Sequence, residues 1–146
     1  MNIKRESLRA RMLLVALTVS IVAALSIQAR ATYNAQVTAD EPQYLLTALS
    51  LGEDFDLDIS DEIEDGKFRD FHEVNLNPQT IALNDSGQKI SPHDPLLPIL
   101  LAAPMKVGGW EFAKGALAMI AGITAAATLW LAVRRFRVGV STATWV

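Results

Sequence analysis

Two adjacent carboxylates followed by a proline are the residues of this chain best placed to do chemistry. Asp40 and Glu41 precede Pro42 and a short segment with a broad apolar face, residues 44–51. Asp at a helix start, Pro in the first turn and acids near the positive end of the helix dipole are each favourable, so the pair has a purely structural explanation. A carboxylate held at a rigid helix start can also act as a general base or bind a cation that bridges a phosphate.

Three further acids, Asp54, Asp56 and Asp58, alternate with apolar residues and resemble the start of a calcium loop. An EF-hand loop needs Gly at its sixth position and Glu at its twelfth. Counted from Asp54, those positions hold Ile59 and Asp65. The pattern therefore fails, and a solvated acidic face is the favoured interpretation.

The two histidines, His72 and His93, lack the spacing of metal ligands, and each is expected to be a surface or hydrogen-bonded loop residue. His93 belongs to "SPHDP", in which Asp94 before Pro95 again matches a helix cap. The chain has no cysteine, which excludes disulfides and thiolate chemistry. It has no nucleophile elbow, glycine-rich phosphate loop or zinc motif, and the glycosylation tripeptide at 84–86 is one that is common by chance.

Two apolar segments and an acidic stretch between them must position these residues. Residues 12–29 are uncharged and reach the lower length limit of a membrane-spanning helix. With the basic leader 1–11 and "ARA" at 29–31 they also match a signal peptide with its cleavage site. An uncleaved anchor and a cleaved signal therefore both stay open.

The second expected span is residues 110–133, in which 115–133 carry no charge and extend about 28 Å as a helix. Trp110 and Trp130 lie near its ends, as interfacial aromatic residues often do. Small residues recur near one face, which favours close helix packing; they are Gly115, Ala118, Gly122 and Ala126. The alternative is an alanine-rich core helix of a soluble protein, which the three arginines after residue 133 disfavour.

Charge differs strongly between segments. The leader has a net charge of +3, whereas residues 31–109 carry fourteen acidic and four basic side chains, a net charge of −10. The positive-inside rule places both basic ends in the cytoplasm and residues 30–109 outside, as one extracytoplasmic loop. The basic residues flank apolar segments and form no patch with aromatics, so nucleic-acid binding is excluded. We therefore expect an α-helical protein of the cell membrane with two transmembrane helices and cytoplasmic termini.

Within the loop we expect a helix near 40–51, ended by Gly52, and another near 95–107. The second is apolar but short and interrupted by prolines, which is typical of an interfacial or re-entrant helix. Residues 53–65 fit either a half-buried strand or a solvated acidic stretch, and residues 80–83 and 88–91 flank "NDSG" as a small hairpin would. Residues 134–146 are a basic tail or the start of a further span.

The order of these parts resembles the amino-terminal part of multi-pass membrane glycosyltransferases that use lipid-linked sugars. It runs from a span through "DEPQYLLTALSL", "DFDLD", a hairpin and "HDPLLPILLAAPMKVGG" to a second span, over residues 12–137. Protein O-mannosyltransferases and the aminoarabinose transferases of lipid A belong to that superfamily. The resemblance implies a catalytic role for Asp40 and Glu41, and substrate binding by Tyr44, His93 and Asp94. The aminoarabinose transferases have Lys where this chain has Asp94.

The implied activity is transfer of a sugar from a polyprenyl-phosphate carrier in the membrane lipid to an extracytoplasmic acceptor. Asp40 would act on the acceptor or hold a divalent cation on the phosphate. Family members have many more spans, so we expect a truncated member that needs the missing spans or a partner subunit. Basic groups for the phosphate are few, and Lys89 and Lys106 are the nearest ones outside the expected spans. The alternative is a small two-span membrane protein whose acidic loop binds a partner protein or cations.

Overall fold

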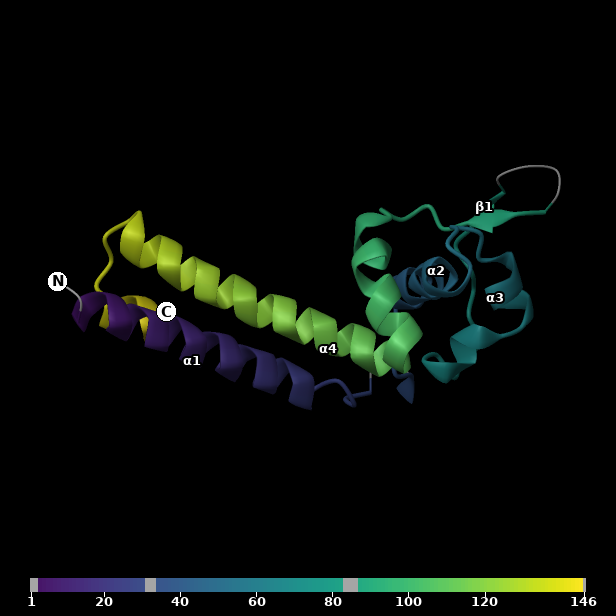
Figure 1. Ribbon diagram of the computed structural model, residues 1–146. Coiled ribbons are helices and arrows are strands. Elements are labelled where there is room, and N and C mark those ends of the chain that lie inside the picture. The colour runs from purple at the N-terminus through teal and green to yellow at the C-terminus, as the bar shows by residue number, and fades with distance from the viewer. Residues whose placement is uncertain (1–2, 31–33, 83–86, 146) are drawn as a thin grey trace. The chain divides into compact units, whose positions relative to one another are not determined.

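The computed structural model describes residues 3–30, 34–82 and 87–145, which are mostly helical. The elements are α1 (Ile3–Leu25), α2 (Glu41–Glu53), α3 (Ser60–Glu64), the 3-10 helix η2 (Lys67–Asp70), strands β1 (Ile81–Ala82) and β2 (Lys89–Ile90), α4 (Leu96–Arg134) and α5 (Val140–Trp145) (Figure 1). The chain forms two compact units, residues 1–27 with 115–146, and residues 28–114. The expected cleavage tripeptide at 29–31, the hairpin turn and the glycosylation tripeptide at 84–86 fall partly or wholly outside the described residues.

Two helices are long and apolar enough to cross a membrane, Ser7–Leu25 within α1 and the whole of α4. Helix α1 begins inside the basic leader and ends before residue 29, so the expected bounds 12–29 are shifted. The helix ends where the Ser26 hydroxyl donates to the Ala23 carbonyl at 2.7 Å, which satisfies an acceptor of the last turn. A signal sequence meets the same length and composition criteria, so α1 as anchor and α1 as cleaved signal both stay open.

Helix α4 joins the two helices expected at 95–107 and 110–133, with a sharp break between them. Gly108 has φ −147° and Gly109 has φ 67° and ψ −161°, a conformation that glycine adopts at low cost. At the start of the helix, the Asp94 carboxylate accepts a hydrogen bond from the Leu96 N–H at 2.8 Å. The expected capping role of Asp94 is thus confirmed.

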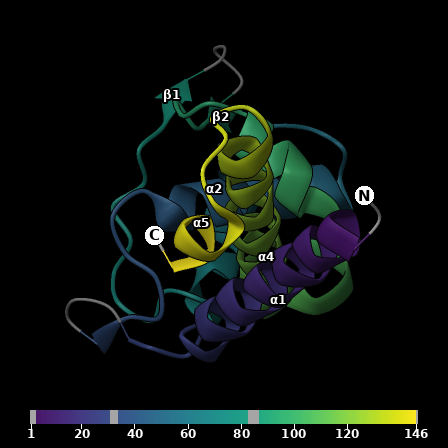
Figure 2. The same ribbon diagram turned by 90° about the vertical axis from the view of Figure 1, so that its left-hand side faces the viewer.

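In the first unit, α1, α5 and the part of α4 from residue 115 run beside one another (Figures 1 and 2). The two long helices approach each other closely at Gly122, where an added Cβ would overlap Ser20 Oγ and the Ala16 carbonyl. Ala118 is also buried, whereas a Cβ on Gly115 would meet no atom within 4 Å. The small residues therefore do permit close packing, and Gly122 is the critical one.

We expect Gly122→Val to destabilise this helix pair by about 2 kcal/mol, because overpacking a tight contact typically costs 1–3 kcal/mol. Thermal unfolding of the full chain in detergent micelles measures the effect. Gly115→Val is the matched control, since it changes helix propensity equally at a site with open space around it. Equal unfolding temperatures for the two variants would show that the contact at Gly122 does not exist.

The second unit, residues 28–114, is organised around α2. Its core consists mainly of apolar side chains that are fully or almost fully buried, namely Val37, Leu45, Leu46, Ile59, Phe71 and Leu101. Gly52 does not end α2 as expected, because the helix continues to Glu53. Gly52 instead permits the close approach of α4, since a Cβ there would lie 2.8 Å from the Ala102 carbonyl oxygen.

Residue 53 ends α2, and residues 54–65 form a turn and then α3, so the expectation of a strand over 53–65 is wrong. The alternating apolar residues of this stretch suggested a half-buried strand, but in the structure they do not lie on one common face. Phe55 is 81% exposed and has φ 65°, while Ile59 is fully buried. The two expected hairpin strands are present as β1 and β2, which pair antiparallel with Ile81 opposite Ile90.

Candidate functional site

Asp40 occupies the N-cap position of α2, but its carboxylate makes no capping hydrogen bond. Its backbone is already helical, with φ −85° and ψ −11°, whereas a capping residue normally has an extended backbone. The Asp40 carbonyl starts the helix by accepting from the N–H groups of Gln43 and Tyr44 at 3.0 and 3.3 Å. The expectation that the Asp40 side chain caps the helix is therefore wrong, and this carboxylate, 57% exposed, is directed to other partners.

Those partners are His93 and Gln79. His93 Nε2 lies 4.0 Å from Asp40 Oδ1, and the Gln79 side-chain amide donates to the same oxygen at 3.4 Å. The ring of Tyr44 lies against His93, with 5.1 Å between the ring centroids. The Nε2 atom of His93 is buried and has no hydrogen-bond partner among the described residues. The fold thus brings His93 against Asp40 and Tyr44, which lie one helical turn apart at the start of α2 and far earlier in the sequence.

This arrangement suits proton transfer. An imidazole nitrogen that faces a carboxylate can exchange a proton with it directly or through one water molecule. Tyr44 packs on the imidazole and restricts its orientation. Asp40 and His93 offer one oxygen and one nitrogen to a divalent cation, which is fewer ligands than such ions usually take from a protein.

Glu41 is held in an ion pair with a residue far along the chain, which no local sequence pattern predicts. Its Oε1 lies 3.0 Å from Lys114 Nζ, and Lys114 also donates to the Gln36 carbonyl at 3.2 Å and lies over the Trp110 ring. This part-exposed ion pair ties Glu41, at the start of α2, to Lys114.

Lys114 was overlooked because it falls inside the expected span 110–133. In the structure it belongs to the unit 28–114, where its Nζ pairs with Glu41 at 3.0 Å. Lys106 lies instead over the ring of Phe55 at 5.0 Å. Glu111 and Lys114 are the charged residues within 110–133. These charges are the sequence feature that separates residues 110–114 from the uncharged stretch 115–133.

The other polar candidates have structural contacts. The Asp94 carboxylate caps α4 and so orders the chain just after His93. His72 is buried, and its Nδ1 lies 2.9 Å from the Val37 carbonyl, which confirms the expected hydrogen-bonded loop residue.

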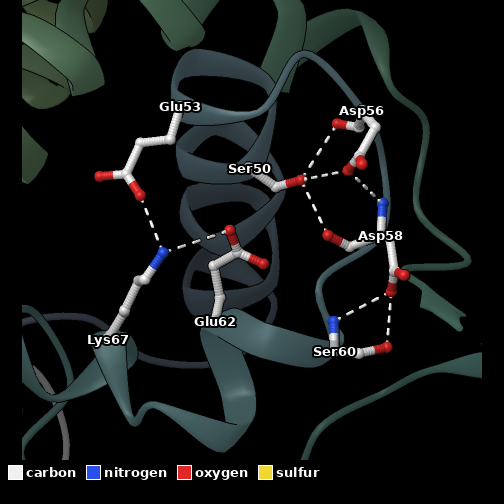
Figure 3. A network of polar contacts seen from close by, with 7 residues as sticks. All are labelled: Ser50, Glu53, Asp56, Asp58, Ser60, Glu62 and Lys67. Atoms are coloured by element: carbon white, nitrogen blue, oxygen red, sulfur yellow. Dashed lines mark hydrogen bonds and ion pairs between the residues drawn. The ribbon is translucent and has the colours of Figure 1, made fainter.

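Two acids of "DFDLD", Asp56 and Asp58, build a hydrogen-bonded turn (Figure 3). Ser50 Oγ lies 2.8–3.1 Å from oxygens of Asp56 and Asp58. Asp58 Oδ1 accepts from the Ser60 hydroxyl at 2.5 Å and from the N–H groups of Ser60 and Lys89 at 3.1 and 3.0 Å. Burial acts to raise the pKa of Asp58, but these hydrogen bonds outweigh it and lower the pKa below its usual value. Asp58 thereby ties the end of α2 to α3 and β2.

We expect Asp58→Ala to destabilise the chain by about 2 kcal/mol at neutral pH, since it removes the hydrogen bonds that Asp58 accepts from the Ser60 hydroxyl and from the N–H groups of Ser60 and Lys89. Because the folded-state pKa is lowered, this stabilisation is present above the carboxyl pKa of the unfolded chain and is lost as pH falls through the folded-state value. Denaturant unfolding of the full chain at a series of pH values tests this. Asp70→Ala, at an exposed aspartate, is the control, and equal losses in both variants would refute the role of Asp58.

Asp40, Tyr44 and His93 therefore form one cluster. Glu41 follows Asp40 in the chain but pairs with Lys114, and Asp94 is a cap. Comparisons of the chain with models of known protein families, with curated proteins and with solved structures found no match. The residues and their geometry are accordingly the basis for assigning a function.

Proposed function

We propose that this chain is the amino-terminal segment of a membrane glycosyltransferase that transfers a sugar from a polyprenyl-phosphate carrier to an extracytoplasmic acceptor. The observation that carries the proposal is that the Asp40 carboxylate makes no capping hydrogen bond to α2. It lies instead 4.0 Å from His93 Nε2, a buried nitrogen without a hydrogen-bond partner among the described residues. A carboxylate needed only to start a helix would bond to the backbone N–H groups of its first turn. The order of sequence parts around the cluster supports the choice of reaction.

In the proposed reaction, Asp40 takes the proton of the acceptor hydroxyl as general base. The acceptor oxygen forms a bond to the anomeric carbon while the bond from that carbon to the phosphate oxygen breaks, and polyprenyl phosphate leaves. After the transfer, Asp40 gives this proton to the facing Nε2 of His93, which releases it to solvent and so restores the carboxylate. Glu41 and Lys114 hold the start of α2 in place as an ion pair.

The two long apolar helices would anchor residues 28–114 at the extracytoplasmic face of the cell membrane, with both termini in the cytoplasm. The lipid-linked sugar needs a cavity in the membrane, which further spans or a partner subunit would supply. A divalent cation that neutralises the phosphate would draw on Asp40 together with ligands from outside this chain.

Transfer in native membranes tests this function. We expect membranes from cells with the gene deleted to lose transfer of a radiolabelled sugar from the polyprenyl-phosphate pool to one acceptor, and a restored copy to recover it. Unchanged labelling of every acceptor in the deleted strain would reject the proposal.

A second candidate is a two-span membrane protein whose acidic loop binds a partner protein. The feature that favours it is the exposed acidic surface of residues 53–65, which includes Glu64 and Asp65. Combined Glu64→Gln and Asp65→Asn substitutions would then abolish capture of the partner, and Asp40→Asn would have no effect. The glycosyltransferase proposal requires instead that Asp40→Asn abolishes sugar transfer and that the combined Glu64→Gln and Asp65→Asn substitutions leave it unchanged.

A further inference from the structure

Three carboxylates gather where the end of α2 meets α3. Oxygens of Glu53, Asp54 and Glu62 all lie within 4.8 Å of one another. Glu53 and Asp54 are exposed, whereas the side chain of Glu62 is 0% exposed. The cluster lies at the other end of α2 from Asp40, about 20 Å away by the rise of the helix.

Glu62 is a buried carboxylate with a long ion pair, to Lys67 at 3.7 Å. Neither of its side-chain oxygens has a hydrogen-bond partner among the described residues. Lys67 Nζ lies 2.8 Å from Glu53 Oε2 but 3.7 Å from Glu62 Oε1, beyond hydrogen-bonding distance (Figure 3). Because an unsatisfied buried carboxylate is costly, its presence beside two other carboxylates indicates a ligand that all three share.

The spacing of the oxygens suits a large, hard cation. Calcium takes six to eight oxygen ligands at 2.3–2.6 Å, so oxygens up to roughly 5 Å apart can share one ion. Magnesium binds at 2.0–2.1 Å, which limits opposite ligands to a separation of about 4 Å and demands near-octahedral geometry. The exposure of Glu53 and Asp54 leaves room for water to complete a calcium coordination shell.

We propose that Glu53, Asp54 and Glu62 form a calcium site, in which the ion takes the place of the Lys67 ammonium group. Lys67 is 27% exposed and has a long flexible side chain, so it can move into solvent when calcium enters. The bound ion would join the end of α2 to α3 and satisfy the oxygens of Glu62. This site uses none of the residues of the Asp40 cluster, and it stands or falls independently of sugar transfer.

Equilibrium binding of radioactive calcium to the purified full chain in detergent micelles tests the site. We expect Lys67→Gln to bind calcium roughly tenfold more tightly than the parent, because a competing positive charge is removed. Glu62→Gln should weaken binding by at least about tenfold, because one of three carboxylates is lost. Glu64→Gln, an exposed glutamate of the same helix, should bind as the parent does.

Thermal unfolding with calcium, with magnesium and with chelator gives an independent measurement. Calcium should raise the unfolding temperature of the parent and of the Glu64→Gln variant more than magnesium does, and should not raise that of Glu62→Gln. Glu62→Gln removes a buried charge and should fold, so its loss of binding would not reflect unfolding. No saturable binding in the parent or in Lys67→Gln, or equal calcium shifts in all variants, would overturn the proposal and leave a simple ion-pair cluster.

Discussion

Asp40→Asn is expected to lower sugar transfer in native membranes by at least roughly 100-fold, the typical contribution of a general base. Asparagine has the same shape and can still accept the hydrogen bond from Gln79, but it cannot take a proton. The initial rate of transfer, normalised to the amount of the protein in the membrane, measures the effect. Membrane insertion and abundance should not change, because the Asp40 carboxylate does not cap α2.

The control for this experiment is Asp70→Asn, which neutralises an exposed aspartate of the same unit and should transfer at the parent rate. Glu41→Gln should have a smaller effect than Asp40→Asn, because it weakens the ion pair with Lys114 without removing the base. Full transfer by Asp40→Asn, with only a small loss of stability, would show that Asp40 serves the structure alone.

Glu62→Gln is expected to stabilise the folded chain by roughly 3 kcal/mol at about pH 8 in calcium-free buffer, as the shift in the pKa of Glu62 implies. Burial raises the pKa of Glu62 from 4.5 to about 7, with the neighbouring Asp61 adding to the rise and Lys67 opposing it. The unfolded chain therefore releases this proton at lower pH than the folded chain does. Stability of the parent falls as pH rises from 4.5 through about 7, and the glutamine variant avoids that loss.

Denaturant unfolding of the full chain in micelles, with chelator present and across this pH range, measures the difference. The parent and Glu62→Gln should converge at acid pH, where Glu62 is protonated in both the folded and the unfolded chain. Glu64→Gln should show no such pH-dependent gain, because Glu64 is exposed. If the stability difference between Glu62→Gln and the parent stays constant with pH, or appears only at acid pH, then the pKa of Glu62 is not raised by burial.

Features set by local sequence were predictable. The two long apolar helices follow from apolar composition, and the hairpin strands follow from the turn-type residues "NDSG" between them. Asp94 before a proline and an apolar run correctly indicated a cap, since capping depends on neighbours in the chain. Membrane location, the orientation of the termini and sugar transfer stay predictions from the sequence.

Features that depend on contacts between distant residues were not predictable. Gly52 looks like a helix stop, but its role is to admit the backbone of Ala102. Lys114 lies 73 positions after Glu41, and no local pattern announces that they pair. The same holds for Glu62, because its burial and its closeness to Glu53 arise only once α3 packs on α2.

The most direct test of the central claim is to ask whether the lipid-linked sugar reaches Asp40. Gln79→p-benzoylphenylalanine places a photoreactive group at a position whose side chain contacts Asp40 at 3.4 Å. In native membranes supplied with radiolabelled polyprenyl-phosphate sugar, light should attach the label to this variant, and unlabelled donor should prevent it. The same group at Glu64, near the other end of α2, should remain unlabelled. No labelling at position 79, or labelling that unlabelled donor does not reduce, would contradict the assignment of Asp40 to a glycosyltransferase site.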